Sequence, residues 1–372
     1  MHAAVPMASE DHAQLRRRLI AAAGIATLLP ATLSGAASAS AVDPFKDPLD
    51  RPADRTALAT TTPVNAIARA GSRLVGVGIR GLVIVSDDAG RSWQQANVPV
   101  ASDLTALQFV TPQLGWATGH DGVLLHSTDG GATWVKRLDG RMTAKALTAH
   151  FEALAAKGER DAAALLDAVK QNYATGPEQA LLGVAFKDAR TGWACGSFGT
   201  LLGTQDGGQT WQSWMEHIAN PKLLHLNAVV QIGGQVLIAS EQGTVFRLDA
   251  QRQRFDPIAT GYAGSFFGFV GRDDDVLAHG LRGTAFRSRT GGASWNKLSL
   301  NLNAGLNGGA VFDDGTFALV SQDGRVLLSS DRGDSFRPLA VPRPSLFTSI
   351  TQASPGTAVV GGLGGVSLIA LR

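Results

Sequence analysis

The chain has 372 residues, among them 33 basic and 31 acidic side chains, 44 glycines and a single cysteine. Its formal net charge is only +2, whereas a surface that binds the phosphate backbone of a nucleic acid normally has a clear excess of basic residues, so no nucleic-acid partner is expected. One cysteine excludes an intrachain disulfide and a thiolate metal cluster, and abundant glycine between short apolar runs favours an all-β protein.

The first 41 residues are typical of an export signal. Three arginines at 16–18 precede an Ala/Leu-rich run from Leu19 to Leu33, and small residues around Ala39 and Ala41 suit a cleavage site. The run is too short and too rich in alanine for a comfortable membrane span. We expect the protein to be exported by the Sec or the twin-arginine route, to lose residues 1–41 by cleavage, and to be periplasmic or otherwise exported. A Pro/Asp-rich linker is expected at 42–54.

One turn motif recurs along the rest of the chain and reads S-x-D-x-G-x-x-W. The Ser or Thr hydroxyl and the Asp carboxylate can bond turn amides, the Gly supplies a positive φ, and the aromatic residue leaves the turn to pack inward. A structural role therefore explains the motif. Its copies are Ser86, Asp88, Gly90, Trp93; Ser127, Asp129, Gly131, Trp134; Thr204, Asp206, Gly208, Trp211; Ser288, Gly292, Trp295; and Ser329, Asp331, Gly333, Phe336.

The spacing of these turns indicates a β-propeller. Ser86 and Ser127 are 41 residues apart, as are Ser288 and Ser329, and each interval holds four short strand-like runs, a to d. The seventh unit has strands a to c only, while residues 55–62 have strand composition and no unit of their own. We therefore predict an all-β, seven-bladed β-propeller of four-stranded blades over 55–372, closed by pairing of 55–62 with Val366–Ala370.

One insert interrupts the repeat between blades two and three, at about residues 141–179. It is rich in Ala, and Leu147, Phe151 and Leu154 recur at helical spacing, as do Ala162, Leu166, Val169 and Tyr173. Gly158 separates the two runs. The insert is predicted to be a helical hairpin.

The loops between strands b and c and the connections from d to the next a lie on one rim of such a propeller, which we name the b–c rim. Exposed loops on a rigid scaffold are where function usually resides. The alternative is a solvated rim without a partner. The residues that vary between the glycines of these loops are the partner-binding candidates: Arg80, His120, Asp121, Phe198, Glu241, Arg282 and Asp323.

No cofactor or metal is expected. The eight histidines are scattered without ligand spacing, and no glycine-rich phosphate loop opens a helix. The pair His120-Asp121 adjoins a glycine turn and is better explained as part of that turn.

The recurring turns are Asp-box, or BNR, repeats, and the chain resembles the photosystem II stability and assembly factor family over roughly residues 55–372. The resemblance rests on the density of these turns and on the sequence of strands a and b, as in Leu104–Phe109 followed by Gly115–Gly122. It implies a single propeller that acts as a non-enzymatic, monomeric scaffold for a protein partner, such as a subunit of a membrane complex. The decayed turn near Arg247 and the helical insert depart from the family pattern.

The competing class is a glycoside hydrolase, because Asp boxes also occur in sialidases and glucan hydrolases. A sialidase needs a Tyr nucleophile, and the only tyrosines are Tyr173, on a predicted helix face, and Tyr262. A pair of carboxylates among Asp121, Glu241 and Asp323 would suit a glucan-active enzyme. The only aromatic platform in those loops would be Phe198.

Overall fold

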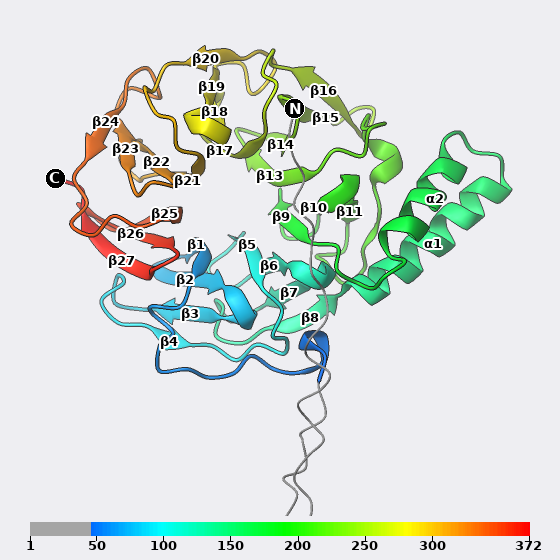
Figure 1. The fold of residues 1–372 in the computed structure, drawn as a ribbon, viewed down its shortest axis with the longest axis horizontal. Coiled ribbons are helices and arrows are strands. Elements are labelled where there is room, and N and C mark those ends of the chain that lie inside the picture. Colours follow the sequence, from blue (N-terminus) through cyan, green and yellow to red (C-terminus); the bar gives the residue numbers. More distant parts are fainter. Residues whose placement is uncertain (1–45) are drawn as a thin grey trace, which may run out of the picture. The chain divides into compact units, whose positions relative to one another are not determined.

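The structure is a computed structural model that describes residues 46–372, so the predicted export signal lies outside the described residues. Seven antiparallel sheets surround a central channel, which confirms the seven-bladed β-propeller (Figure 1). Within each sheet the strands follow one another in chain order from the channel outward. Blades one to three consist of β1 (Val64–Ala70), β2 (Arg73–Gly78), β3 (Val83–Ser86), β4 (Gln94–Gln95); β5 (Leu104–Phe109), β6 (Gly115–Gly119), β7 (Leu124–Ser127), β8 (Val135–Leu138); and β9 (Leu181–Phe186), β10 (Gly192–Gly196), β11 (Leu201–Thr204), β12 (Gln212–Ser213). Blades four to seven consist of β13 (Leu226–Ile232), β14 (Gln235–Ser240), β15 (Thr244–Asp249), β16 (Arg254–Ala259); β17 (Phe266–Arg272), β18 (Asp275–Gly280), β19 (Ala285–Ser288), β20 (Asn296–Leu298); β21 (Leu306–Val311), β22 (Phe317–Ser321), β23 (Val326–Ser329), β24 (Arg337–Leu339); and β25 (Phe347–Ser354), β26 (Thr357–Gly362), β27 (Gly365–Ala370).

The Asp boxes join strands c and d and also fit each blade against the preceding one. In blade two, the Ser127 hydroxyl accepts the Gly131 amide at 2.8 Å and donates to Asp129. Gly131 has φ 84°, and a Cβ there would lie 3.1 Å from Val75 of blade one. At Gly90 the corresponding contact is 2.6 Å to Val359 of blade seven. These glycines are therefore required both by the turn and by the packing between blades.

A series of side-chain hydrogen bonds joins the inner strands of most neighbouring blades around the channel, whereas blade three carries Leu182 at the bonding position and makes no such bond. Blade five carries Phe267 in place of the usual polar residue, and the buried His279 bonds the Leu306 carbonyl instead, at 2.9 Å. The last bond of the series joins blade seven directly to blade one. The other bonds run from Asn65 to Leu104 O, Thr105 to Leu181 O, Asn227 to Phe266 O, Asn307 to Phe347 O and Thr348 to Val64 O, at 2.6–2.9 Å.

The predicted closure of blade seven is wrong. Its sheet has three strands, and residues 58–62 form a turn that makes a single backbone bond to it, from Val366 N–H to Thr60 O at 2.9 Å. Residues 47–50 instead contact Lys136 of blade two and Arg141 of α1, and the chain then follows the outer side of blade one, where Arg55 bonds Asn97 and the Thr56 amide bonds Gln95. Polar side chains of blade one engage the segment, and contacts between inner strands already close the ring.

The helical hairpin is confirmed as α1 (Gly140–Ala156) and α2 (Ala162–Asn172), between β8 and β9. Leu147 and Phe151 are buried against blade three, and Gly158 ends the first helix with φ 74°. Asp139 caps α1 by accepting the Met142 amide at 3.0 Å. Neither helix, nor any other in residues 46–372, is long and apolar enough to cross a bilayer.

Candidate protein-binding rim

The b–c turns of five blades share one backbone conformation. Each has a left-handed residue directly before a positive-φ glycine, such as Arg80 with φ 54° before Gly81 with φ 70°. A Cβ on Gly81 would lie 2.1 Å from the Val100 carbonyl oxygen, so this position requires glycine and the preceding one is free to vary. The five variable residues are Arg80, Asp121, Phe198, Gln242 and Arg282.

Gln242, rather than the predicted Glu241, occupies the equivalent position in blade four. Counting back from Gly243 would have identified it in the sequence. His120 directly precedes the variable position of its turn, and its side chain is exposed. Asp323 is also exposed, but it lies in the turn of blade six, which has a different backbone conformation.

The acidic candidates Asp121, Glu241 and Asp323 already accept hydrogen bonds from nearby groups of the protein. Asp121 accepts the Ser102 hydroxyl at 2.6 Å, and Glu241 accepts the His225 backbone amide at 2.9 Å. Asp323 accepts the Ser321 hydroxyl at 2.5 Å and pairs with Arg325 at 3.1 Å. The three carboxylates stand on blades two, four and six, which are not adjacent, and each is held by hydrogen bonds to other groups.

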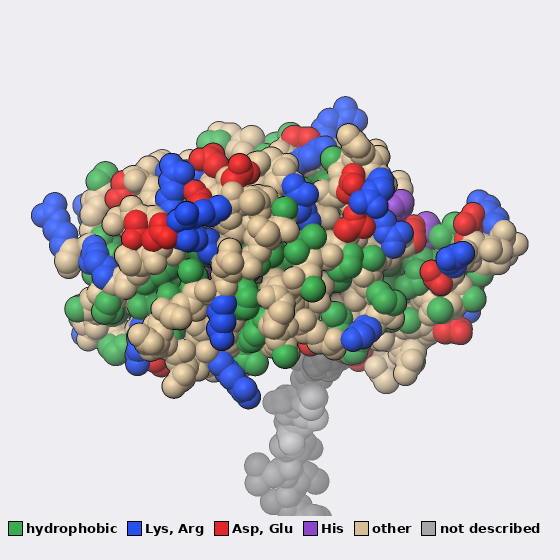
Figure 2. All heavy atoms as spheres, turned by 90° about the horizontal axis from the view of Figure 1, so that it is seen from above, with side chains coloured by type: hydrophobic (Ala, Val, Ile, Leu, Met, Phe, Trp, Pro, Cys, Tyr) green, Lys and Arg blue, Asp and Glu red, His purple; other side chains and the backbone are tan. Residues whose placement is uncertain are grey.

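The basic candidates differ from these carboxylates. Arg80 and Arg282 are exposed, and neither has an acidic partner within 4 Å among residues 46–372. The Arg80 backbone amide donates to Asp103 at 2.7 Å, which fixes the turn and leaves the guanidinium free. On the face of the molecule that Figure 2 shows, acidic side chains mix with Lys and Arg along the upper margin and are sparse along the lower one.

Exposed apolar side chains accompany these arginines. Phe198 is 42% exposed and stacks at a tilt on His225, with ring centroids 4.8 Å apart. Leu281 and Leu363, in the turns of blades five and seven, are 39% and 62% exposed. Both leucines occupy the first variable position of their turns, and they are not among the residues predicted from the sequence, because the exposure of an apolar side chain depends on the tertiary structure.

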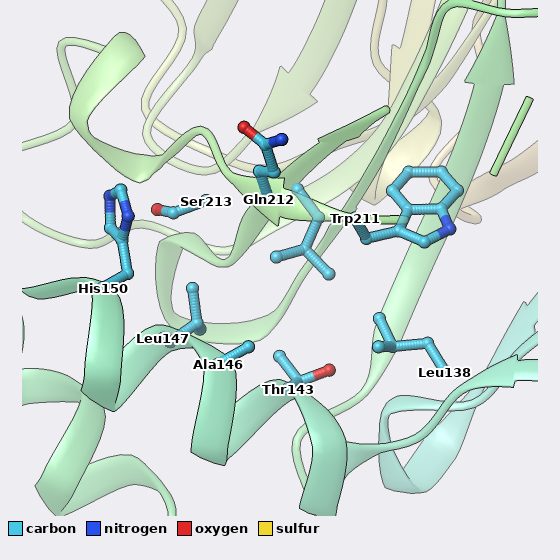
Figure 3. A pocket seen from close by; sticks show the side chains of 9 residues that line it. Leu138, Thr143, Ala146, Leu147, His150, Trp211, Gln212 and Ser213 are labelled. Atoms are coloured by element: carbon cyan, nitrogen blue, oxygen red, sulfur yellow. The ribbon is translucent and has the colours of Figure 1, made fainter. Parts of the chain in front are cut away.

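A cavity of about 200 Å³ lies where α1 meets the outer strands of blade three (Figure 3). One wall is formed by Leu138 and by α1 residues that include Leu147, and the other by Trp211 and its neighbours. At its edge, His150 Nε2 lies 2.7 Å from Glu216 Oε1, and the Ser213 hydroxyl donates to Glu216 Oε2 at 2.7 Å. Because the carboxylate separates the imidazole from the hydroxyl, this cluster is not arranged as a Ser-His-acid triad.

The two tyrosines have structural surroundings. Burial raises the pKa of Tyr173 to about 12, which disfavours the phenolate that a nucleophile needs. The Tyr262 hydroxyl donates to the Leu281 carbonyl at 3.0 Å. Within residues 46–372, no three His, Cys, Asp or Glu side chains converge in a way that could hold a metal ion.

Comparison with known proteins connects this propeller to photosystem II assembly factors. The family model described as Photosynthesis system II assembly factor YCF48 matches residues 72–160, which cover most of blades one and two and α1. The chloroplastic photosystem II stability/assembly factor HCF136 of Guillardia theta is 35% identical over 71 residues, 18% of each protein. The photosystem II assembly lipoprotein Ycf48 of Synechococcus sp. (strain CC9902) is 25% identical over 276 residues, which cover 68% of this chain and 80% of the relative.

Two solved structures share the fold. YCF48 bound to D1 peptide superposes with a TM-score of 0.60 at 16% identity, covering 84% of this chain and 94% of that one. YCF48 from Cyanidioschyzon merolae gives 0.59 at 17% identity, covering 83% and 95%. The chain is therefore a seven-bladed β-propeller similar to the photosystem II assembly-factor family, in the sequence of its first blades as well as in its fold.

Proposed function

We propose that this protein is an exported, non-catalytic scaffold that binds a segment of a protein partner on its b–c rim and so assists the assembly or stability of a membrane-protein complex. The similarity to assembly factors supports the proposal, as does the related structure of YCF48 bound to D1 peptide. A rim of short turns on a closed ring is rigid, and binding to it therefore costs little ordering of the scaffold.

The observation that carries this proposal is that the acidic side chains of the rim have partners within the protein, whereas its two arginines do not. Asp121, Glu241 and Asp323 are already bonded within the protein, whereas Arg80 and Arg282 extend from rigid turns without an acidic partner in the described part of the chain. The exposed guanidinium groups favour an acidic or carboxylate-bearing segment, because complementary charge guides encounter and fixes register. Phe198, Leu281 and Leu363 add apolar contacts around them.

Affinity capture from the periplasmic fraction of the host, followed by mass spectrometry, tests the proposal. The variant with Arg80→Glu and Arg282→Glu should lose most of the captured partner, while its melting temperature stays within about 2 °C of the wild type. The matched control is Arg91→Glu with Arg337→Glu, a reversal of two exposed arginines at the Asp-box end of blades one and six. Normal capture by the rim variant, or equal loss in the control, would contradict the rim as the contact surface.

The same preparation distinguishes the scaffold from a glycoside hydrolase. The scaffold proposal expects no release of sugar from sialosides or glucans. Cleavage that disappears in Asp121→Asn or Glu241→Gln would replace the scaffold with the hydrolase.

A further inference from the structure

The outer edge of β27 is an open sheet edge. Backbone groups of alternate residues point to opposite sides of an antiparallel strand. Val366 N–H points away from β26, towards Thr60, whereas Leu371 N–H donates to Gly356 on the β26 side. The N–H groups of Leu368 and Ala370 therefore face outward, and among residues 46–372 neither has a hydrogen-bond partner.

This edge lacks the features that usually protect exposed edges. The strand reads Gly-Val-Ser-Leu-Ile-Ala, without a charge or a proline. Leu368 is 44% exposed, and its side chain extends towards the Gly90 turn of blade one. An apolar, unprotected edge of this kind is suited to pairing with another strand.

The other six blades show what fits at this position. Each has a fourth strand against its third, and in several blades one apolar residue of that fourth strand is buried, as are Leu138 of β8, Phe255 of β16 and Leu339 of β24. Blade seven is built on the same plan up to β27, the outermost strand of its sheet (Figure 1). The internal repeat therefore defines the missing group as one extended strand with an apolar residue facing inward.

We propose that the edge of β27 binds one extended segment of a partner protein, which adds the fourth strand of blade seven. The partner segment must expose backbone acceptors to Leu368 and Ala370 and be free of proline at those pairing positions. A second copy of the chain does not suit the edge, since six residues span only about 20 Å and a stable dimer needs roughly 1,200 Å² or more of buried surface. This surface lies on the wall of blade seven and does not depend on the proposed role of the b–c rim.

A peptide copied from this protein provides the probe. A fluorescent peptide of residues 132–139, which contains the d strand of blade two, is titrated against the protein purified from its host, and binding is followed by fluorescence anisotropy. Two further versions of the peptide carry backbone N-methyl groups on every second residue. The first version is methylated at one set of alternate residues and the second version at the other set. Only the set that faces β27 should weaken binding, by at least tenfold, because N-methylation removes donors on one edge of a strand and leaves the side chains unchanged.

Two further measurements locate the site on the protein. The amides of Leu368 and Ala370 should exchange with deuterium rapidly in the free protein and at least tenfold more slowly with peptide, whereas the Ile369 amide, which faces β26, stays protected in both. Leu368→Pro removes one outward donor and should weaken binding at least tenfold; if this variant does not fold, the pair of methylated peptides decides. Equal binding of the two methylated peptides, or protection of Leu368 and Ala370 before peptide is added, would overturn the proposal.

Discussion

The carboxylate of Asp129 should stabilise the fold without contributing to function. It accepts the Ser127 hydroxyl at 2.8 Å, the Thr133 amide at 2.9 Å and the Thr133 hydroxyl at 2.6 Å. Burial works to raise the pKa of Asp129, but these hydrogen bonds outweigh it and hold the pKa below its usual value. Bonds to a charged acceptor contribute about 1.5–3 kcal/mol each when buried, and water replaces part of that here because Thr133 is exposed.

Asp129→Ala should therefore lower the free energy of unfolding by about 1–3 kcal/mol. Blade five supplies a matched comparison, since Thr290 stands in place of the Asp and its hydroxyl still accepts the Ser294 amide at 3.0 Å. Asp129→Thr should recover the equivalent bond to Thr133 and lose less than Asp129→Ala. Asp167→Ala, on the helical hairpin, is the control and should change stability by less than about 0.5 kcal/mol.

Urea denaturation at pH 7 measures these differences as shifts of the midpoint at constant m-value. Partner capture by Asp129→Ala should remain normal at a temperature where the variant is folded. The reasoning fails if Asp129→Ala is as stable as the wild type, or if the Thr variant is no better than the Ala variant.

Three further predictions concern packing, pH and export. Gly90→Ala should cost about 2–4 kcal/mol, since the new Cβ would meet Val359 at 2.6 Å in a left-handed conformation; a change below about 1 kcal/mol in urea denaturation would contradict this contact between blades one and seven. Burial lowers the pKa of His279 to about 4, so the unfolded chain takes up the proton first and stability falls as the pH decreases from about 6.5 to 4, by up to about 3 kcal/mol. His279→Asn, whose amide nitrogen is as far along the side chain as the Nδ1 that bonds the Leu306 carbonyl, should flatten that dependence, and equal slopes for the two proteins would refute the assignment. N-terminal sequencing of the protein from its host should find a start near Val42, and replacement of Arg16 and Arg17 by Lys should block export only if the twin-arginine route is used; an intact Met1 start would remove the export prediction.

The sequence determined the features that depend on neighbouring residues. The Asp-box turns, their spacing and the alternation of short strands with glycine turns depend on contacts within a few residues, and they sufficed to predict seven blades. The same holds for the helical hairpin, where the spacing of Leu147, Phe151 and Val169 identified the faces that the structure buries. The b–c turns were likewise located from their glycines.

The tertiary structure decided which segments and charges meet. Composition suggested that residues 55–62 could pair with β27, but Arg55 and Thr56 engage Asn97 and Gln95 of blade one instead. The sequence does not show that the Glu241 carboxylate is hydrogen-bonded whereas the Arg80 guanidinium is free. That difference depends on whether a partner, such as the His225 amide beside Glu241, lies opposite the side chain. Such partners come from other loops or other blades, and closure of the ring sets their distances, so the strand pattern of a single repeat cannot contain them.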